Sequence, residues 1–207
     1  INEYLVATFI WAAYQENYRH ITEDRPIRVA VPVNLRPYFD SITTKNFFVM
    51  VSAEFAPQKN EYTFAEILAI TKDSLRAQIN KEHLEKIFSY NVSNELMVVA
   101  RAVPLFLKNL AMRLVYTQSA LANTTTVTNI GNIKVEKVYE PYIQTVHSFL
   151  SFSKGQSLKA TITSYQDTLV YTYTSAWQDT AIQRRVFRQI AQDGIDVKIE
   201  TNGVYYE

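Results

Sequence analysis

The chain has 207 residues, a net charge of +1 and no cysteine. Its length suits one large domain or two small ones, and its 47% hydrophobic and 20% charged residues exclude an intrinsically disordered chain. The near-neutral charge gives no electrostatic case for binding nucleic acid or a membrane surface. The lack of cysteine excludes disulfides, thiolate zinc sites and a cysteine nucleophile.

The apolar segments and the start of the chain bear on where the protein resides. No apolar run reaches the length of a membrane span; Pro104–Leu114 comes closest, but Lys108 and Arg113 interrupt it. The first residues resemble the interior of a helix, and no signal peptide precedes them. We therefore expect a cytoplasmic protein, of which these residues are a fragment.

The first part of the chain predicts one helix and two strands. Tyr4–His20 is rich in alanine and aromatic residues on nearly every side, as is typical of a buried helix. Ile27–Val33 is β-branched, and Pro32 within it favours an edge or a strand end. Asn46–Phe55 is apolar on both faces at its start, which is typical of a central strand.

The middle of the chain predicts three helices. Thr63–Glu66 has the pattern of a capping box and opens a helix over Phe64–Asn80. The second helix covers Glu82–Val103 and the third covers Leu105–Thr117, where Pro104 suits the first turn. The first of these helices should bury one apolar stripe, formed by Phe64, Leu68, Thr71, Leu75 and Ile79.

The last third of the chain is dominated by alternation of apolar and polar residues, the pattern of strands. Tyr165–Thr168 is turn-like and joins two of these strands in a hairpin. The predicted strands are Thr124–Thr128, Val146–Phe152, Leu158–Ser164, Leu169–Ala176 and Ile195–Thr201.

One more helix is predicted over Ala181–Gln192. Thr180–Gln183 has a capping pattern, Gly194 suits the C-cap, and the helix presents a stripe of Ile182, Val186 and Ile190. No linker divides the chain and no repeat is visible. We therefore predict a single α/β domain over residues 1–207, with a mixed β-sheet flanked by helices.

The three histidines are the first candidates for chemistry. His20 and Asp24 have the spacing His-x-x-x-Asp, but they sit at a helix end before a proline, which favours a structural surface role. His83 lies among glutamates at a helix start and should be solvated. His147 alternates with Phe149 on a predicted strand, so it is either a base or, without an apparent carboxylate partner, part of the packing of a core or an edge.

Other catalytic and metal patterns are absent from the sequence. No two histidines have ligand-like spacing, no glycine loop could cradle a phosphate, and there is no Gly-x-Ser-x-Gly elbow. Thr126–Thr128 followed by Asn129-Ile130-Gly131 is a β-branched strand that stops on polar residues, where a sheet often presents side chains to a ligand. A simple turn explains the same residues.

Three short segments together resemble a known family. They are Ala30–Arg36 (AVPVNLR) followed by Asn46-Phe47-Phe48, then Val127–Gly131 (VTNIG), and finally Ser164–Leu169 (SYQDTL). In order and spacing they resemble the second half of chloramphenicol acetyltransferase-like acyltransferases. That superfamily includes peptide-synthetase condensation domains, wax ester synthases and alcohol acetyltransferases, and the chain looks most like the bacterial alcohol acetyltransferases.

The sequence departs from this family at the catalytic motif. The His-His-x-x-x-Asp of the family lies in its first half, upstream of everything seen here, and His20 has no second histidine beside it. We therefore assign no catalytic residue and no metal ligand. The resemblance implies the C-terminal lobe of a two-lobed enzyme of the CoA-dependent acyltransferase fold, with the N-terminal lobe missing from these residues.

The resemblance also implies what this lobe would contribute. Acyl-CoA or another acyl thioester would be the co-substrate, with no bound cofactor, and a small alcohol or amine would be the acceptor. The lobe would form part of the wall of the tunnel between the lobes, and Thr126, Thr128 and Asn129 would contact the coenzyme A or the oxyanion, since hydroxyl and amide groups can donate hydrogen bonds. Hydroxyls that simply fill a strand remain an equal explanation.

Two functions of different classes follow. The first is the C-terminal half of an O-acyltransferase, and the second is a non-catalytic binding or scaffolding domain that kept the fold. On its own, the chain should be inactive, and its lobe-facing side should be bare and apolar. We therefore expect self-association through that side, as a symmetric homodimer.

Overall fold

The structure is a computed structural model that describes residues 1–17, 21–22, 24–97, 103–153 and 155–202. Its strands and helices are interspersed along the chain. The strands are β1 (Ile27–Asn34), β2 (Phe48–Phe55), β3 (Thr125–Asn132), β4 (Leu158–Tyr165) and β5 (Thr168–Ser175), and the helices are α1 (Asn2–Asn17), α2 (Phe64–Gln78), α3 (Lys81–Leu96), α5 (Leu105–Leu121), the short 3-10 helix η2 (Glu140–Tyr142) and α6 (Ala181–Gln192).

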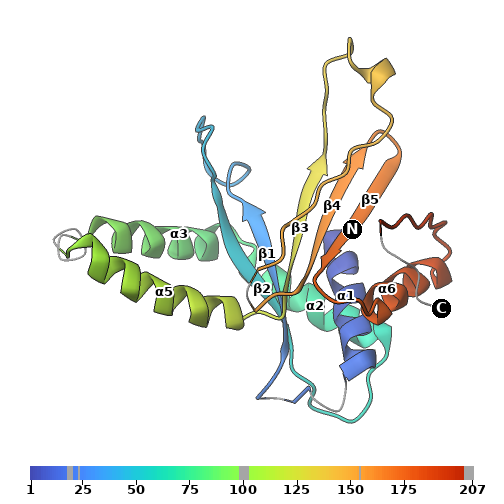
Figure 1. The fold of residues 1–207 in the computed structure, drawn as a ribbon, viewed down its shortest axis with the longest axis horizontal. Helices are drawn as coiled ribbons and strands as arrows, with labels where there is room; N and C mark the ends of the chain where they lie inside the picture. The colour runs from blue at the N-terminus through green and yellow to red at the C-terminus, as the bar shows by residue number, and fades with distance from the viewer. Residues whose placement is uncertain (18–20, 23, 98–102, 154, 203–207) are drawn as a thin grey trace.

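The strands form one mixed five-stranded sheet in the order β2-β1-β3-β4-β5. The two outer pairs, β1 with β2 and β4 with β5, are antiparallel, while β3 runs parallel to both β1 and β4. β3 is therefore the central strand (Figure 1). The predicted mixed sheet flanked by helices is confirmed.

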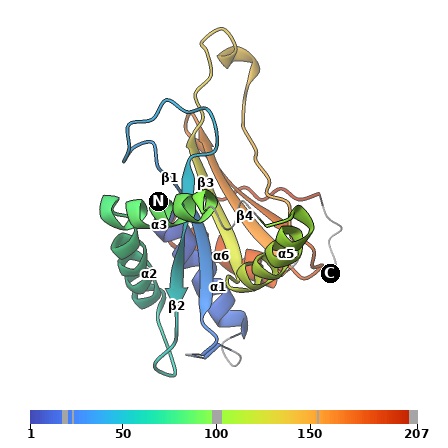
Figure 2. The ribbon, with the colours of Figure 1, turned by 90° about the vertical axis from the view of Figure 1, so that its left-hand side faces the viewer.

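One face of the sheet carries the core. Residues at every second position of the strands are buried there, and α1, α2 and α6 contribute the other buried side chains (Figures 1 and 2). α1 is apolar all round, as predicted, and Val6, Phe9 and Ile10 are buried. The Tyr171 hydroxyl of β5 also reaches this helix and donates to the Leu5 carbonyl at 3.2 Å.

The local signals of α2 and α6 are largely confirmed. The capping box of Thr63 and Glu66 is present, but the buried residues of α2 are Ile67, Thr71 and Leu75, so the stripe is centred on Ile67 rather than Leu68. In α6, Val186 and Ile190 are buried as predicted. The Thr180 side chain makes no cap bond; Asp179 accepts from the Ala181 N–H at 2.9 Å in its place.

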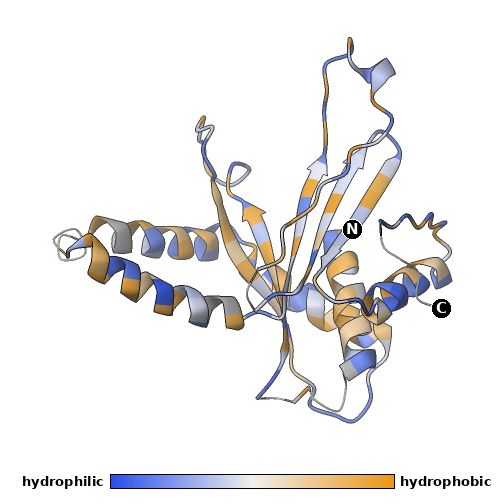
Figure 3. Cartoon of the chain, in the orientation of Figure 1, coloured by the Kyte–Doolittle hydropathy of each residue, from blue (hydrophilic) through white to orange (hydrophobic). Residues whose placement is uncertain are grey.

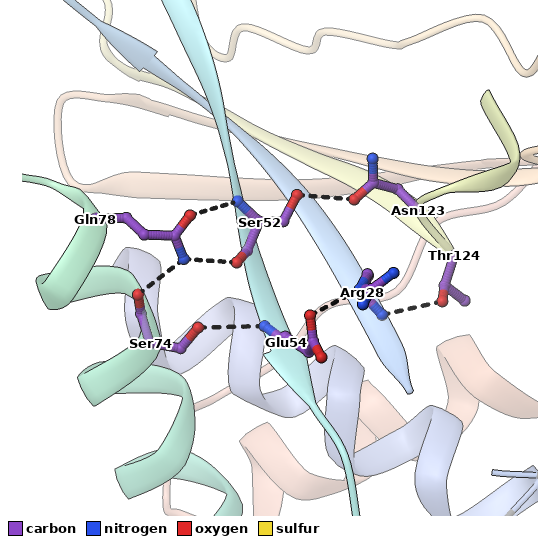
Figure 4. Close-up of polar contacts among 7 residues, drawn as sticks. All are labelled: Arg28, Ser52, Glu54, Ser74, Gln78, Asn123 and Thr124. Atoms are coloured by element: carbon purple, nitrogen blue, oxygen red, sulfur yellow. Dashed lines mark hydrogen bonds and ion pairs between the residues drawn. The ribbon is translucent and has the colours of Figure 1, made fainter. Parts of the chain in front are cut away.

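Side chains of α2 occupy the outer edge of β2 (Figure 4). The Gln78 amide accepts from the Ser52 N–H at 3.3 Å and donates to the Ser52 carbonyl at 2.8 Å. One turn earlier, the Ser74 hydroxyl accepts from the Glu54 N–H at 3.3 Å. The edge groups of β2 thus bond to a helix rather than to a strand.

The predicted helix bounds differ from the observed ones at several ends. α1 begins at Asn2, and residues 18–20 of the predicted Tyr4–His20 helix lie outside the described residues. α3 ends at Leu96 rather than Val103, with residues 98–102 again outside the described ranges, and α5 continues past Thr117 to Leu121. Across the described ranges, no helix combines the length and apolar character needed to span a membrane.

Two predicted strands, Val146–Phe152 and Ile195–Thr201, are wrong. The first is not paired in the sheet, because it passes over the sheet face and is held there by threonine side chains. In the second, Ile195 and Ile199 are exposed, so the alternation does not bury one side. β3, in contrast, runs past the predicted end at Thr128 to Asn132, through a register shift between Asn129 and Gly131.

Candidate functional site

Hydrogen bonds fix the start of β3, the strand that carries the predicted site. The Ser52 hydroxyl donates to the Asn123 side-chain oxygen at 2.8 Å, and the Thr124 hydroxyl accepts from the Arg28 N–H at 3.1 Å. Arg28 is itself held by Glu54, with 2.7 Å between Nε and Oε2 (Figure 4). Two strands, β1 and β2, therefore set the position from which β3 starts.

The predicted residues lie on β3 but are engaged differently. Alternation along the strand places Thr126 and Thr128 on one face and the buried Thr125 and Val127 on the other. The Thr126 hydroxyl donates to Gln156 Oε1 at 2.9 Å, and Asn129 Oδ1 accepts from the Gly131 N–H at 2.8 Å.

The Thr128 side chain differs from those of Thr126 and Asn129. No hydrogen bond joins it to a described residue, and Thr128 is only partly buried. Thr128 could thus donate to a ligand without breaking an existing bond, and so could the amide N–H groups of Asn129, whereas the Thr126 hydroxyl already donates to Gln156.

The register of the sheet brings further hydroxyls next to Thr128. Thr128 lies beside Thr161 of β4, which lies beside Thr172 of β5. We call this side of the sheet the polar face; it carries Thr126, Thr128, Thr161, Thr163, Thr172 and Thr174.

Two buried hydroxyls on the polar face have no hydrogen-bond partner among the described residues. They are those of Thr161, which is 2% exposed, and Ser148, which crosses the sheet above it. Thr172 connects the two residues, since its hydroxyl lies 2.5 Å from the Ser148 carbonyl and 3.2 Å from the Thr161 carbonyl. Burying a hydroxyl without a partner costs free energy, so these two groups mark a place suited to a polar ligand atom or a water. The sequence did not single them out, because their proximity depends on the strand register.

Residues Thr145–Ser151, which we call the strap, cover part of the polar face. The connection from β3 to β4 rises beyond the ends of the strands and then returns across the sheet (Figure 1). Its carbonyls bind threonine hydroxyls, with Val146 accepting from Thr163 at 2.9 Å and Leu150 accepting from Thr174.

Among the described residues, no histidine assembles a catalytic group with these hydroxyls. His20 lies outside the described residues, and Asp24 is exposed. His147 is exposed on the strap, so the predicted packing in a core is wrong; its Nε2 lies 3.1 Å from the Thr145 hydroxyl, and its ring stacks on Phe149. Within the described ranges, no cluster of three or more acidic or histidine side chains could hold a metal ion.

Lys198 and Glu200, two charged residues near the strap, form an ion pair with each other. The hydrogen bond from Lys198 lowers the pKa of the Glu200 carboxyl, and His147 contributes a smaller lowering. On the opposite, core side, burial raises the pKa of the Tyr171 hydroxyl, so it remains a donor to the Leu5 carbonyl. The polar face therefore offers neutral hydroxyl donors, and the register also places Lys159 of β4 on this face, beside Thr174.

Comparisons with known proteins show the fold alone. No protein-family model matches the chain, and no curated protein matches it. Among solved structures, 92% of the chain superposes on 18% of the nonribosomal peptide synthetase FmoA3, with 18% sequence identity and a TM-score of 0.54. The starter condensation domain of the rhizomide synthetase RzmA is matched over 95% of this chain and 45% of that one, with 12% identity and a TM-score of 0.49.

The chain therefore spans less than half the length of either solved chain. Its fold also occurs within a nonribosomal peptide synthetase.

Proposed function

We propose that the chain is the C-terminal lobe of an acyl-CoA-dependent O-acyltransferase of the alcohol acetyltransferase type. A facing N-terminal lobe supplies the histidine base, and the polar face lines the passage through which acyl thioester and acceptor meet. The observation that supports this most is the free Thr128 hydroxyl beside the buried, unpartnered Thr161 hydroxyl. Because coenzyme A thioesters are cytoplasmic metabolites, the proposal also places the protein in the cytoplasm.

In the proposed acyl transfer, this lobe would supply hydrogen-bond donors rather than the base. When the acceptor oxygen attacks the thioester carbonyl, negative charge develops on the carbonyl oxygen, and preorganised donors stabilise it. A threonine hydroxyl on a central strand is held in place by the sheet and needs little reorganisation to donate. Asn129 retains its amide N–H groups for the same purpose, because its contact with Gly131 uses only the oxygen.

Kinetics of the complete gene product test this role. The Thr128→Val variant should lower kcat by about tenfold to a thousandfold and change KM much less, since an oxyanion donor acts mainly in the transition state. Asn129→Ala should act in the same direction. The assay follows thiol release from acetyl-CoA with short-chain alcohols as acceptors, and the chain of residues 1–207 alone should show no turnover.

Thr174→Val is the matched control, because it makes the same chemical change on the same face but removes a hydroxyl already committed to the Leu150 carbonyl. Unchanged kinetics in both the Thr128 and Asn129 variants would remove these residues from the mechanism. A complete gene product without His-His-x-x-x-Asp and without turnover would favour the second function, a binding or scaffolding domain, which the exposed apolar side chains of α5 also fit.

A further inference from the structure

The strap runs as an extended strand without a strand partner. Thr172 and Thr174, two residues apart on β5, contact the carbonyls of Ser148 and Leu150, which are also two residues apart. The strap therefore advances along the chain at the same rise as β5 and in the same direction. Its sequence alternates as a strand does, yet among the described residues no backbone-to-backbone hydrogen bond is made by residues 145–151.

The carbonyls that bind the threonines define which edge of the strap is free. In an extended strand, the N–H and C=O groups of one residue point to one side and those of the next residue point to the other. The carbonyls of Val146, Ser148 and Leu150 point toward the polar face. The N–H and C=O groups of the residues between them must therefore point away from the sheet, and none of these groups bonds to a described residue: Thr145, His147, Phe149 and Ser151.

A free strand edge with exposed apolar side chains is unusual in a finished protein. Such an edge is a template for pairing, and folded proteins normally cover it, charge it or shorten it. Here Phe149 is 64% exposed, and the strap itself carries no lysine, proline or carboxylate that would discourage pairing.

We propose that the outward edge of the strap pairs with the edge strand of a β-sheet in the facing lobe. The strap lies over the polar face, so whatever covers that face meets the strap first. The identity of the facing lobe rests on the proposed function, whereas the pairing rests on the free edge alone. The main-chain hydrogen bonds provide the affinity, and His147 and Phe149 flank the new strand.

Amide hydrogen exchange tests the pairing directly. In the complete gene product, the amides of His147 and Phe149 should exchange at least a hundredfold more slowly than in the chain of residues 1–207. The His147→Pro variant, which lacks the outward N–H, should speed exchange at Phe149 in the complete protein at least tenfold. His147→Thr keeps the N–H and should retain the protection.

Each outcome decides the proposal. Equal, fast exchange in both proteins would overturn it, and so would protection that survives in His147→Pro. Protection that appears in the isolated chain and fades on dilution would assign the edge to a second copy and overturn the facing lobe. Acyl transfer is measured separately. Protection without turnover would support the pairing and count against the proposed function. Turnover without protection would support the proposed function and count against the pairing. His147→Pro should leave the melting temperature of the isolated chain unchanged, since the His147 N–H has no partner among the described residues.

Discussion

Helices α1 and α5 are alike in length and apolar content, but α1 is buried and α5 is exposed. Both are rich in apolar residues, with 16 and 17 residues, although α5 also has hydrophilic residues along its length (Figure 3). Phe9 of α1 is 2% exposed, whereas Phe106 of α5 is 71% exposed. α1 lies against the sheet with α2 and α6 beside it, while α5 extends away from the sheet together with α3 (Figures 1 and 2).

This difference shows how much the apolar residues of a helix tell about its surroundings. The pattern indicates that other elements should pack against the helix on several sides, but it does not identify those elements. For α1 the cover is part of the chain, as the ring contacts of Tyr4 and Trp11 with Phe64 of α2 show. For α5, the described residues provide no comparable layer.

The largest expected effect on stability comes from a substitution in the buried helix α1. Phe9→Ala should lower the free energy of unfolding by about 3–5 kcal/mol, because it leaves a cavity in a packed core. Leu114→Ala in α5 should change it by less than about 0.5 kcal/mol when the isolated chain is dilute and monomeric, since Leu114 is exposed. Equilibrium urea unfolding measures both, and similar losses in the two variants would mean that α5 is covered after all.

A smaller effect concerns the face opposite α1. Thr172→Val removes the hydroxyl that bonds the Ser148 and Thr161 carbonyls, and it should cost about 1–3 kcal/mol because these groups are largely buried. Thr168→Val, at an exposed position of the same strand, is the control. A neutral Thr172→Val would show that the strap is not held by this hydroxyl.

A third effect tests how α2, which covers α1, is anchored. Thr63→Ala should cost about 1 kcal/mol through loss of the N-cap. The Lys59 and Thr63 contacts lower the pKa of Glu66 to about 2 from 4.5, so the stabilisation is present above about pH 4.5 and is lost as the pH falls toward 2. Glu66→Gln should therefore flatten the loss of stability over that acid range in thermal melts, and an unchanged slope would contradict it.

The smallest expected effect on stability comes from substitutions in the exposed helix α5. Leu107, Leu110, Leu114 and Leu121 fall within one stripe of this helix, and all are exposed. The isolated chain should form a dimer through this side, and replacing Leu110 and Leu114 by serine should abolish the dimer. The melting temperature of the dilute, monomeric chain should stay nearly unchanged, because both side chains are exposed there. Light scattering after size exclusion over a dilution series measures this. A monomer at high concentration would show that α5 does not self-associate.

Signals that act over a few residues predicted much of the fold. The β4–β5 hairpin and α6 were found close to their observed bounds, because turn residues and a single stripe determine them locally. The strap was predicted as a sheet strand, because alternation looks the same whether a strand joins a sheet or lies across its face. The sequence alone did not distinguish backbone partners from threonine hydroxyls.

The candidate site was predictable only in part. Thr126 and Thr128 were singled out from their place before Asn129-Ile130-Gly131, and both lie on the polar face. Thr161 and Ser148 were missed, since their nearness to Thr128 depends on a pairing between β3 and β4 that spans more than thirty residues of chain. The engagement of Thr126 by Gln156 depends on the same long-range arrangement.

The contact between Gln78 and Ser52 has a consequence for how copies of this protein can stack. One amide side chain both accepts from and donates to the same residue of β2, which reproduces the pair of bonds that a sixth strand would make. At Ser52 the main-chain groups of this outer strand are therefore not available to a strand of a second molecule, which works against fibril growth from this part of β2. Gln78→Leu would free these groups again and should raise the tendency of the variant to form fibrils.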